Sequence, residues 1–588
     1  MEIGLSDGGW TVVLSDNGSI RSLSGPRGVA LLCTDQAPFS MNIGATAVAA
    51  GPTSLLHRST TEAGFETILK THSPCAVRIH YTLSGKSEES ALLIARVECT
   101  TIQPLPSDVV FRWTFGCRVG GQVSVFAPMF DGRGLHAASG NERIWYYKAT
   151  GSEESGERLA IPLLEECTAS SGPVVGWFAD PFFGCTIRQY TDRPLEFGTV
   201  FLCAVGANQC AQRVFGMNIH HTRPGGSIET FFRAVVSPGP EGPPWLQDIA
   251  MVHYDYLSEG GDGWYRDIDR LCSLIAPPDR HRVVLTLHGW YDFLGRYAFD
   301  HRSSAFDREW TAMKRSSRTM MTMTDLLRRI DYGKERGFRV LLYFADGLAI
   351  DAGAPSFTPD VVFREPDGSL RRHTWSGPDT INQTYVMNPL HPGVAAFFRE
   401  YLNALLQAAG NHIDGLVWDE TFTIHAGDVS SKPYQGYADR AFMLLCRELR
   451  GHVKQFRQDL AFLGSDCAGF AIPLDDGTTW RADPAQNALV FDGTFQDSHC
   501  NPRAWQYGLF PNFSRVLWSC NWHPVSRFEW MATGVHVFGV PVAISNGWGD
   551  NKGVSQYSEA ETKDLMDLFD VSKQRRHRVR WIDSLEAS

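Results

Sequence analysis

Acidic residues close several apolar, strand-like runs in the second half of the chain. Asp346 ends RVLLYFAD, Asp419 ends DGLVWD and Asp466 ends LAFLGSD. One such residue means little, because an aspartate at this position can simply cap the next helix. Acidic residues close five of eight such runs, however, and tryptophan accompanies four. This repetition indicates a common site where the runs end.

The side chains at these ends favour chemistry on a sugar. Two carboxyl groups can cleave a glycosidic bond, one by protonating the leaving oxygen and one by stabilising or attacking the sugar carbon. Indole faces stack on the C–H faces of a sugar ring, while Asp, Asn and His bind its hydroxyls. We therefore expect a carbohydrate partner, with some of these residues catalytic and the others substrate-binding. The candidates are His288, Trp290, Tyr291, Asp292, Asp346, Trp418, Asp419, Glu420, Asp466, Asp492, Asp497, His499, Trp522, His523, Asn546 and Trp548.

A metal centre is the chief competing explanation for so many carboxylates. The chain has no HxH or HExxH spacing, and His288, His499 and His523 follow different runs. Since no local pair of ligands exists, we expect neither a metal nor another cofactor. A metal-dependent hydrolase on the same scaffold stays open as an alternative.

From Arg282 onward, apolar runs alternate with amphipathic helices, which is typical of βα units on a parallel sheet. Three helices are clear, at residues 323–337, 391–410 and 438–458. Eight strands with such helices favour a closed (β/α)8 TIM barrel, with a doubly wound open sheet as second choice. The expected strands cover residues 282–290, 339–347, 384–389, 414–421, 460–469, 487–495, 515–522 and 540–548.

The first part of the chain has a different sequence pattern. Short β-rich runs separated by Gly, Ser, Asn and Pro predict a large antiparallel β-sandwich over residues 1–240. The Pro- and Gly-rich segment PGPEGPPW then marks a boundary. We expect residues 241–281 to be a connecting segment with one helix and residues 282–588 to form the barrel.

Composition limits the partners. A formal net charge of −11, with no run of Lys or Arg residues that would neutralise successive phosphates, argues against nucleic acid. No apolar run approaches the roughly 20 residues that span a bilayer, and no signal peptide is visible at the N-terminus. The thirteen cysteines form no CxxC pair, which favours a reducing compartment. We expect a cytoplasmic protein without a membrane partner; a signal removed before this numbering and a homo-oligomeric state stay open.

Three runs carry a resemblance to a known group of enzymes. A first strand ending LHGWYDF, a fourth reading HIDGLVWDE and a sixth reading ALVFDGTF follow the β-rich first half. This combination resembles the retaining α-glycosidases of the α-galactosidase and raffinose-synthase type. The resemblance implies a multidomain fold in which a galactose-mutarotase-like supersandwich precedes the (β/α)8 barrel.

The resemblance also assigns roles. In that group an Asp ending the fourth strand is the nucleophile and an Asp ending the sixth is the acid/base, which here implies Asp419 and Asp492. Some related barrel enzymes take the acid from the fifth strand, so Asp466 is the alternative. Glu420 is the other alternative catalytic residue, although neighbouring strand residues face opposite sides. Trp418 replaces the Lys that often precedes the nucleophile in α-galactosidases, so galactose specificity does not follow.

The strand-end residues predict cleavage of a glycosidic bond, and the resemblance implies that the bond is α-linked and is hydrolysed by a retaining double displacement. Three other functions stay open: transglycosylation in the same pocket, non-catalytic carbohydrate binding, and the metal-dependent hydrolase. The sugar, the linkage and exo versus endo action do not follow from the sequence.

Overall fold

The computed structural model divides the chain into two compact units, Met1–Pro238 and Gly239–Ser588. No helix among the described residues is long and apolar enough to cross a membrane. The structure describes all residues except 1, 27–30, 35, 49–52, 69–74, 106–108, 121–122, 129–134, 138–141, 148–156, 160, 169–171, 203–209, 223, 237–241, 256–261, 292–294, 313–318, 374–382, 422, 425–427, 435, 467–471, 474–478, 481–489, 498–515, 521–530, 533–534, 537–540, 547–551 and 575–588.

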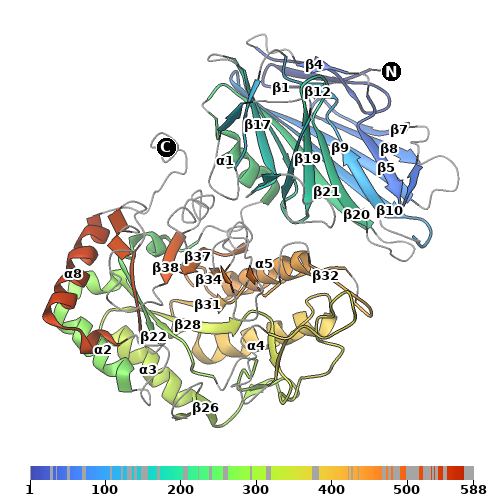
Figure 1. The fold of residues 1–588 in the computed structure, drawn as a ribbon. Coiled ribbons are helices and arrows are strands. Elements are labelled where there is room, and N and C mark those ends of the chain that lie inside the picture. The colour runs from blue at the N-terminus through green and yellow to red at the C-terminus, as the bar shows by residue number, and fades with distance from the viewer. Residues whose placement is uncertain are drawn as a thin grey trace. The chain divides into compact units, whose positions relative to one another are not determined.

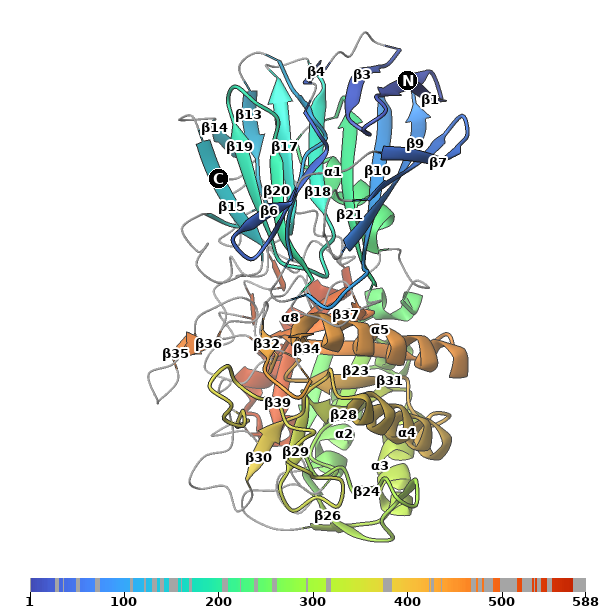
Figure 2. The same cartoon turned by 90° about the vertical axis from the view of Figure 1, so that its right-hand side faces the viewer.

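The first unit consists mainly of antiparallel β-sheet, as the sequence predicted. Among the described residues its larger sheet has the order β14-β13-β17-β18-β21-β10-β9-β8-β7, and the second has the order β16-β15-β19-β20-β11-β5-β6 (Figure 2). A smaller sheet is formed by β1 (Ile3–Asp7), β2 (Trp10–Leu14) and β3 (Ile20–Ser24), and β4 (Leu32–Cys33) pairs with β12 (Cys117–Arg118). The strands of the two large sheets are β5 (Phe39–Ile43), β6 (Thr46–Val48), β7 (Thr53–Arg58), β8 (Glu62–Ile68), β9 (Cys75–Ser87), β10 (Ser90–Thr101), β11 (Val109–Trp113), β13 (Val123–Phe126), β14 (Leu135–Ala137), β15 (Glu142–Tyr147), β16 (Glu157–Arg158), β17 (Leu163–Thr168), β18 (Val174–Ala179), β19 (Cys185–Tyr190), β20 (Glu196–Leu202) and β21 (Cys210–His220).

Aromatic side chains join the two large sheets of this unit. Alternate residues of β11 are buried, because successive side chains of a strand point to opposite faces. The rings of Phe111 and Trp113 on β11 lie 6.4 Å and 5.3 Å, centroid to centroid, from Phe215 on β21 of the other sheet. The two sheets therefore share one apolar core, as in a β-sandwich.

The second unit is built on a parallel sheet in which β22 to β38 follow one another in chain order and β39 lies beside β22. Among the described residues the sheet has eight strands, and every pairing within it is parallel. Figure 1 shows several of them between the helices. The strands are β22 (Met251–Asp255), β23 (Val283–Leu287), β28 (Arg339–Asp346), β31 (Gly415–Asp419), β34 (Ala461–Asp466), β37 (Gly493–Asp497), β38 (Val516–Cys520) and β39 (Val542–Asn546).

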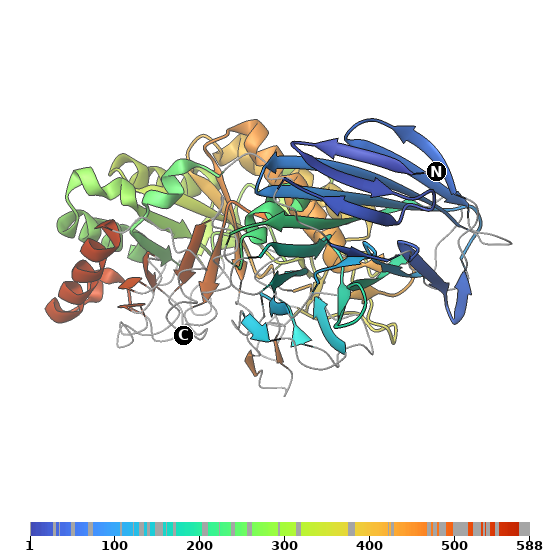
Figure 3. The ribbon, with the colours of Figure 1, turned by 90° about the horizontal axis from the view of Figure 1, so that it is seen from above.

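Helices cover this sheet, so strands such as β22, β23 and β31 are buried along their whole length. A capping box between Thr322 and Asp325 starts α3, and Pro392 in the first turn starts α4. Helix α8 lies beside α2 although the two are far apart in the chain (Figures 1 and 3), and Arg270 donates to Thr562 across them. The main helices are α2 (Asp262–Leu274), α3 (Met323–Glu335), α4 (Pro392–Ala409), α5 (Ala438–Phe456) and α8 (Glu559–Gln574).

Three strand predictions need correction. The segment expected to be a connector, 241–281, contains β22, which lies between β23 and β39 in the sheet. The predicted strand at 384–389 is instead β30 (Thr384–Val386), which pairs antiparallel with β29 (Ala349–Asp351) outside the sheet. The sixth strand, predicted at 487–495, is β37 and begins only at Gly493. The other predicted strands of the second half are present with shorter bounds.

Two long segments leave the sheet beyond the ends of β28 and β31. Residues 347–391 connect β28 to α4 and contain the hairpin of β29 and β30. The segment after β31 contains the short pair β32 (Val429–Ser430) and β33 (Gly436–Tyr437). Both segments begin directly after the acidic residues that close their strands.

Candidate active site

The carboxyl ends of parallel strands meet at one edge of the sheet, where βα proteins bind their ligands. Here Asp346, which ends β28, is the register partner of Asp419, which ends β31. His288 follows the last residue of β23, and its backbone N–H donates to Asp255 O at the end of β22. The ends of four consecutive strands therefore place polar residues side by side.

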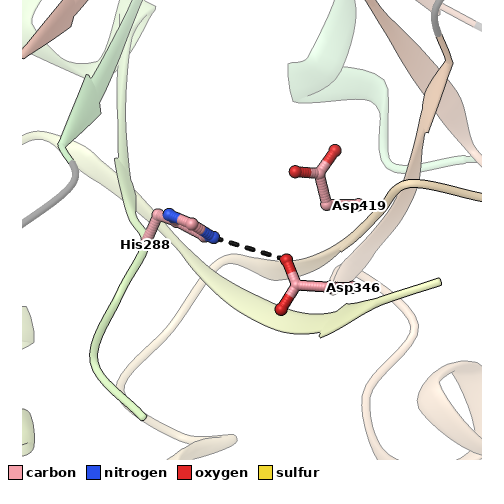
Figure 4. A group of neighbouring side chains, drawn as sticks. All are labelled: His288, Asp346 and Asp419. Carbon is pink, nitrogen blue, oxygen red and sulfur yellow. Dashed lines mark ion pairs between the residues drawn. The ribbon is translucent and has the colours of Figure 1, made fainter. Parts of the chain in front are cut away.

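His288, Asp346 and Asp419 converge at this edge (Figure 4). One polar atom from each lies within 4.8 Å of the others, and all three side chains are buried. His288 Nε2 lies 3.5 Å from Asp346 Oδ1. Two carboxylates and an imidazole in one buried group are suited to proton transfer, to nucleophilic attack or to binding a cation.

Tyr291 fixes the orientation of Asp346. Its hydroxyl donates to Asp346 Oδ2, and both side chains are buried. Burial raises the pKa of Tyr291 well above its usual range, and the negative charge of Asp346 adds to this effect. The phenol therefore remains a proton donor, and the oxygens of Asp346 face Tyr291 on one side and His288 on the other. Asp419, at the end of β31, is the third member of this buried group.

Glu420, the alternative to Asp419, points to a different partner. Its φ of +50° lies in the left-handed region, so the chain turns sharply at the end of β31. Its carboxylate oxygen Oε2 lies 2.8 Å from Nε2 of His373, which comes from the segment 347–391. The pair makes Glu420 part of the support around the site and leaves Asp419 as the better candidate for direct chemistry.

Two tryptophans predicted to bind substrate are buried in the core, which corrects that prediction. Trp290 is 0% exposed and its Nε1 donates to Tyr343 O at 2.8 Å. Trp418 is also 0% exposed, donates to Gly347 O, and packs against Phe442 of α5. Because Trp418 precedes Asp419 in the strand, it faces the helices when Asp419 faces the site. Neither indole presents a face to a sugar.

Asp492, predicted as the acid/base, lies at the wrong end of its strand. It immediately precedes β37, so it sits at the edge of the sheet opposite to Asp419. It is 0% exposed and is held by Arg450 Nε at 2.8 Å, Lys454 Nζ at 2.6 Å and the N–H of Phe462 at 2.9 Å. These contacts make it a structural anion and not a group that meets substrate.

Three of the predicted site residues do end later strands: Asp466 on β34, Asp497 on β37 and Asn546 on β39. Their backbones are described and their side chains are not, so only their positions on the edge are established. The remaining predicted site residues lie outside the described residues: Asp292, His499, Trp522, His523 and Trp548.

Sequence reasoning missed two residues near the site. Asp255 ends β22 and is 1% exposed, but its strand was read as part of a connector. The apolar run IAMVHYD that ends in Asp255 was the available signal. His373 had no local signal, because its partner Glu420 is distant in the sequence and only the fold brings them together.

Comparison with known proteins agrees with this arrangement. No family model matches the chain, and no curated protein matches its sequence. Solved structures do match. The α-galactosidase AgaA of Geobacillus stearothermophilus is 11% identical, with a TM-score of 0.60 over 98% of this chain and 86% of that one. The α-galactosidase of Lactobacillus brevis is 10% identical, with a TM-score of 0.56 over 98% and 84%.

The chain has the fold of the GH36 α-galactosidases. AgaB of Geobacillus stearothermophilus, also a GH36 α-galactosidase, matches at a TM-score of 0.59 with 10% identity, over 98% of this chain and 85% of that one. The GH36 fold therefore accounts for both units of the chain, the β-sheet unit and the parallel-sheet unit. The resemblance read from the sequence is confirmed at the level of fold.

Proposed function

We propose that this protein is a retaining α-glycosidase with Asp419 as nucleophile. The observation that supports this most directly is the convergence of Asp419, Asp346 and His288 at the carboxyl edge of a parallel sheet with the GH36 fold. Asp419 attacks the anomeric carbon, and an acid on a neighbouring strand end protonates the leaving oxygen. Two related structures are complexes with raffinose and stachyose, which favours an oligosaccharide as substrate.

We propose Asp497 as the acid/base in place of Asp492. The group that the sequence resembles takes its acid from the end of the sixth strand, and the residue that ends the sixth strand of this sheet is Asp497. Asp466 at the end of β34 is the alternative acid, because β34 adjoins β31. The acid must lie across the scissile bond from Asp419, with the carboxyl groups about 5–5.5 Å apart for retention.

We infer further that the eight strands close into a (β/α)8 barrel, which in the chain follows a supersandwich of the galactose-mutarotase type. The strands at the two ends of the sheet order, β38 and β39, lie close to each other. Closure would bring the end of β37 across from β31 and β28, as a site shared by Asp419 and Asp497 requires.

The test is a screen of nitrophenyl α- and β-glycosides, followed by variants on any glycoside that is cleaved. Asp419→Ala should lower kcat by about 10⁴-fold or more, and azide should restore turnover with inverted product if Asp419 is the nucleophile. Asp497→Ala and Asp466→Ala distinguish the two candidate acids. The variant that lacks the acid should lose far more activity on glycosides with poor leaving groups than on activated aryl glycosides. Full activity of Asp419→Ala on every glycoside would refute the proposal, and full activity of both acid variants on glycosides with poor leaving groups would refute both acids.

A metal-dependent hydrolase is the second candidate, and one observation favours it. His288, Asp346 and Asp419 offer ligand atoms close enough to share an ion, a convergence that sequence spacing did not reveal. Against it, both oxygens of Asp346 already face His288 and Tyr291. Activity abolished by a chelator and restored by one divalent cation would favour this candidate; activity that withstands prolonged chelation favours the retaining glycosidase.

A further inference from the structure

The segment between β28 and α4, residues 347–391, reaches the turn that follows β31. We call this segment the β28–α4 insert and the residues 420–423 the nucleophile turn. The nucleophile turn contains Glu420, Thr421 and Thr423 among its described residues, and it directly follows Asp419. The backbone of this turn is joined directly to Asp419, the last residue of β31.

The first contact lies at the start of the insert. Gly347 N–H donates to Asp419 O at 2.7 Å, and Leu348 N–H lies 3.4 Å from Thr423 Oγ1. Gly347 has a φ of +54°, and a Cβ there would lie 2.3 Å from Thr423 Oγ1 and 2.6 Å from Glu420 O. The two chain segments therefore approach more closely than any residue with a side chain at 347 would permit.

The second feature is the conformation of Glu420. A φ of +50° is uncommon for a residue with a side chain and costs on the order of 1 kcal/mol or more unless neighbouring contacts hold it. The Glu420 side chain is also buried, and a buried carboxylate needs a partner. The turn is thus in a conformation that it would not keep without support.

His373 of the insert supplies that support. Its side chain is 0% exposed, and its Nε2 lies 2.8 Å from Glu420 Oε2. The His373 backbone is itself fixed, because its N–H donates to Thr384 O at 2.9 Å and Thr384 lies in β30. The imidazole is therefore presented to Glu420 from backbone that is hydrogen-bonded to β30.

Further contacts hold the insert against the segment that follows the turn. Arg371, two residues before His373, forms ion pairs with Glu365 and Asp428, and its Nη1 donates to Thr423 O at 3.4 Å. Burial alone would lower the pKa of Arg371, but these two carboxylates raise it above its usual range. Asn388 Nδ2 donates to Ser430 Oγ at 2.9 Å and anchors the end of the insert.

We propose that His373 is a positioning residue, which by binding Glu420 holds the nucleophile turn and so sets the direction of the Asp419 carboxylate. The proposal rests on the role proposed above for Asp419. The insert then has a function in this chain beyond linking β28 to α4, because it supports the backbone that follows the nucleophile. His373 acts through Glu420 and does not meet the substrate.

The experiment compares His373→Ala with His373→Gln on a glycoside that the wild type cleaves. His373→Ala should lower kcat by roughly 10- to 100-fold with KM changed by less than about threefold, because a nucleophile displaced by a fraction of an ångström binds substrate but attacks poorly. His373→Gln retains a donor for Glu420 and should recover most of that loss. Glu420→Gln combined with His373→Ala should lose no more than the worse single variant.

His253→Ala is the matched control. His253 is also a buried histidine paired with a carboxylate, with Nε2 3.0 Å from Asp267 Oδ2, but it lies on β22 and its partner is on α2. This variant should melt at a lower temperature than the wild type and keep its kcat at temperatures well below the transition. If His373→Ala behaved in the same way, His373 would be merely structural and the proposal would be overturned.

A second measurement does not depend on turnover. Hydrogen exchange should speed up in His373→Ala for the peptides that contain Gly347 and Thr423, whose N–H groups donate to Asp419 O and Glu420 O. His253→Ala should leave those peptides unchanged. If no glycoside is cleaved by the wild type but this exchange pattern holds, the proposed function fails and the bracing of the turn stands. Unchanged exchange in His373→Ala overturns the bracing, whatever the activity.

Discussion

At the scale of single residues, Asp492 shows how a buried aspartate can be mistaken for a catalyst. Val490 and Phe491, just before it, are 2% and 0% exposed, so the stretch looks like the end of a buried strand. The strand in fact begins after Asp492. Apolar character gives burial but not the direction or register of a strand, and only pairing with β34 fixes where β37 starts.

Replacing Asp492 should affect stability far more than chemistry. Asp492→Ala leaves Arg450 and Lys454, which are 4% and 5% exposed, without their common anion, and should lower the free energy of unfolding by about 3–5 kcal/mol. Urea unfolding followed by fluorescence measures this change, and kcat at low temperature should stay near the wild-type value. Asp459→Asn, which breaks an exposed pair with Arg457, is the control and should cost about 0.5 kcal/mol or less. A stable Asp492→Ala variant without activity would instead restore Asp492 as the acid.

Gly347 offers a second test on one residue. Gly347→Ala should destabilise the chain by about 2–4 kcal/mol and reduce kcat, because the new Cβ meets Thr423 Oγ1 and the carbonyl of Glu420. Gly368 is the matched control: its φ is also positive, at +86°, but a Cβ there meets nothing within 4 Å. Gly368→Ala therefore carries only the conformational cost of about 1 kcal/mol. Equal thermal shifts for the two variants would show that the contact with the turn is unimportant.

At the scale of elements, the helices and most strands of the second half could be predicted because their patterns are local. Apolar residues on one face of α5, or Pro392 at the start of α4, are visible in a short window of sequence. β22 and β30 could not be told apart in this way, since both are short apolar runs and only their partners differ. The ends of the strands were predictable for Asp346 and Asp419, whereas the supporting pair of His373 and Glu420 depends on a distant segment.

The contact between β22 and α2 should make stability depend on pH. Burial alone would lower the pKa of His253, but its hydrogen bond to Asp267 and the charge of that carboxylate raise the pKa overall. Burial alone would raise the pKa of Asp267, but hydrogen bonds from His253 and Ser555 lower it overall. The raised pKa of His253 stabilises the fold below about pH 6.5, and this stabilisation is lost as the pH rises through the pKa of His253 in the folded protein. The lowered pKa of Asp267 stabilises the fold above about pH 4, and this stabilisation is lost as the pH falls through the pKa of Asp267 in the folded protein.

The difference in unfolding free energy between the wild type and Asp267→Asn should therefore be largest between roughly pH 4 and 6.5, at about 3 kcal/mol. It should shrink at higher pH, as His253 loses its proton, and at lower pH, as Asp267 gains one. Urea unfolding of both proteins over this range measures the difference. Lys563→Ala, which removes an exposed pair with Asp567 on α8, should show no comparable maximum. A difference that rises steadily toward alkaline pH would contradict the assignment.

At the scale of the whole molecule, the division into Met1–Pro238 and Gly239–Ser588 gives each unit its own core. The sheets of the first unit close on a continuous cluster of buried apolar side chains, including Trp113, Phe111 and Phe215, that lies entirely within that unit. A segment with a complete core can fold without the rest of the chain. The second unit needs β22 for a complete sheet, because β22 pairs with both β23 and β39. A fragment of this unit must therefore begin near residue 239, since one that begins at residue 282 lacks β22.

Expression of residues 1–238 alone should therefore give a β-rich domain that unfolds cooperatively, as measured by circular dichroism and urea titration. Residues 239–588 should yield folded protein, whereas residues 282–588, which begin at the boundary that the sequence suggested, should aggregate because β23 and β39 lose the strand between them. Asp492→Ala should lower the transition of 239–588 as it does in the full chain, while 1–238, which lacks that residue, supplies the unaffected reference. A folded 282–588 fragment as stable as 239–588 would show that β22 is dispensable for folding of the second unit.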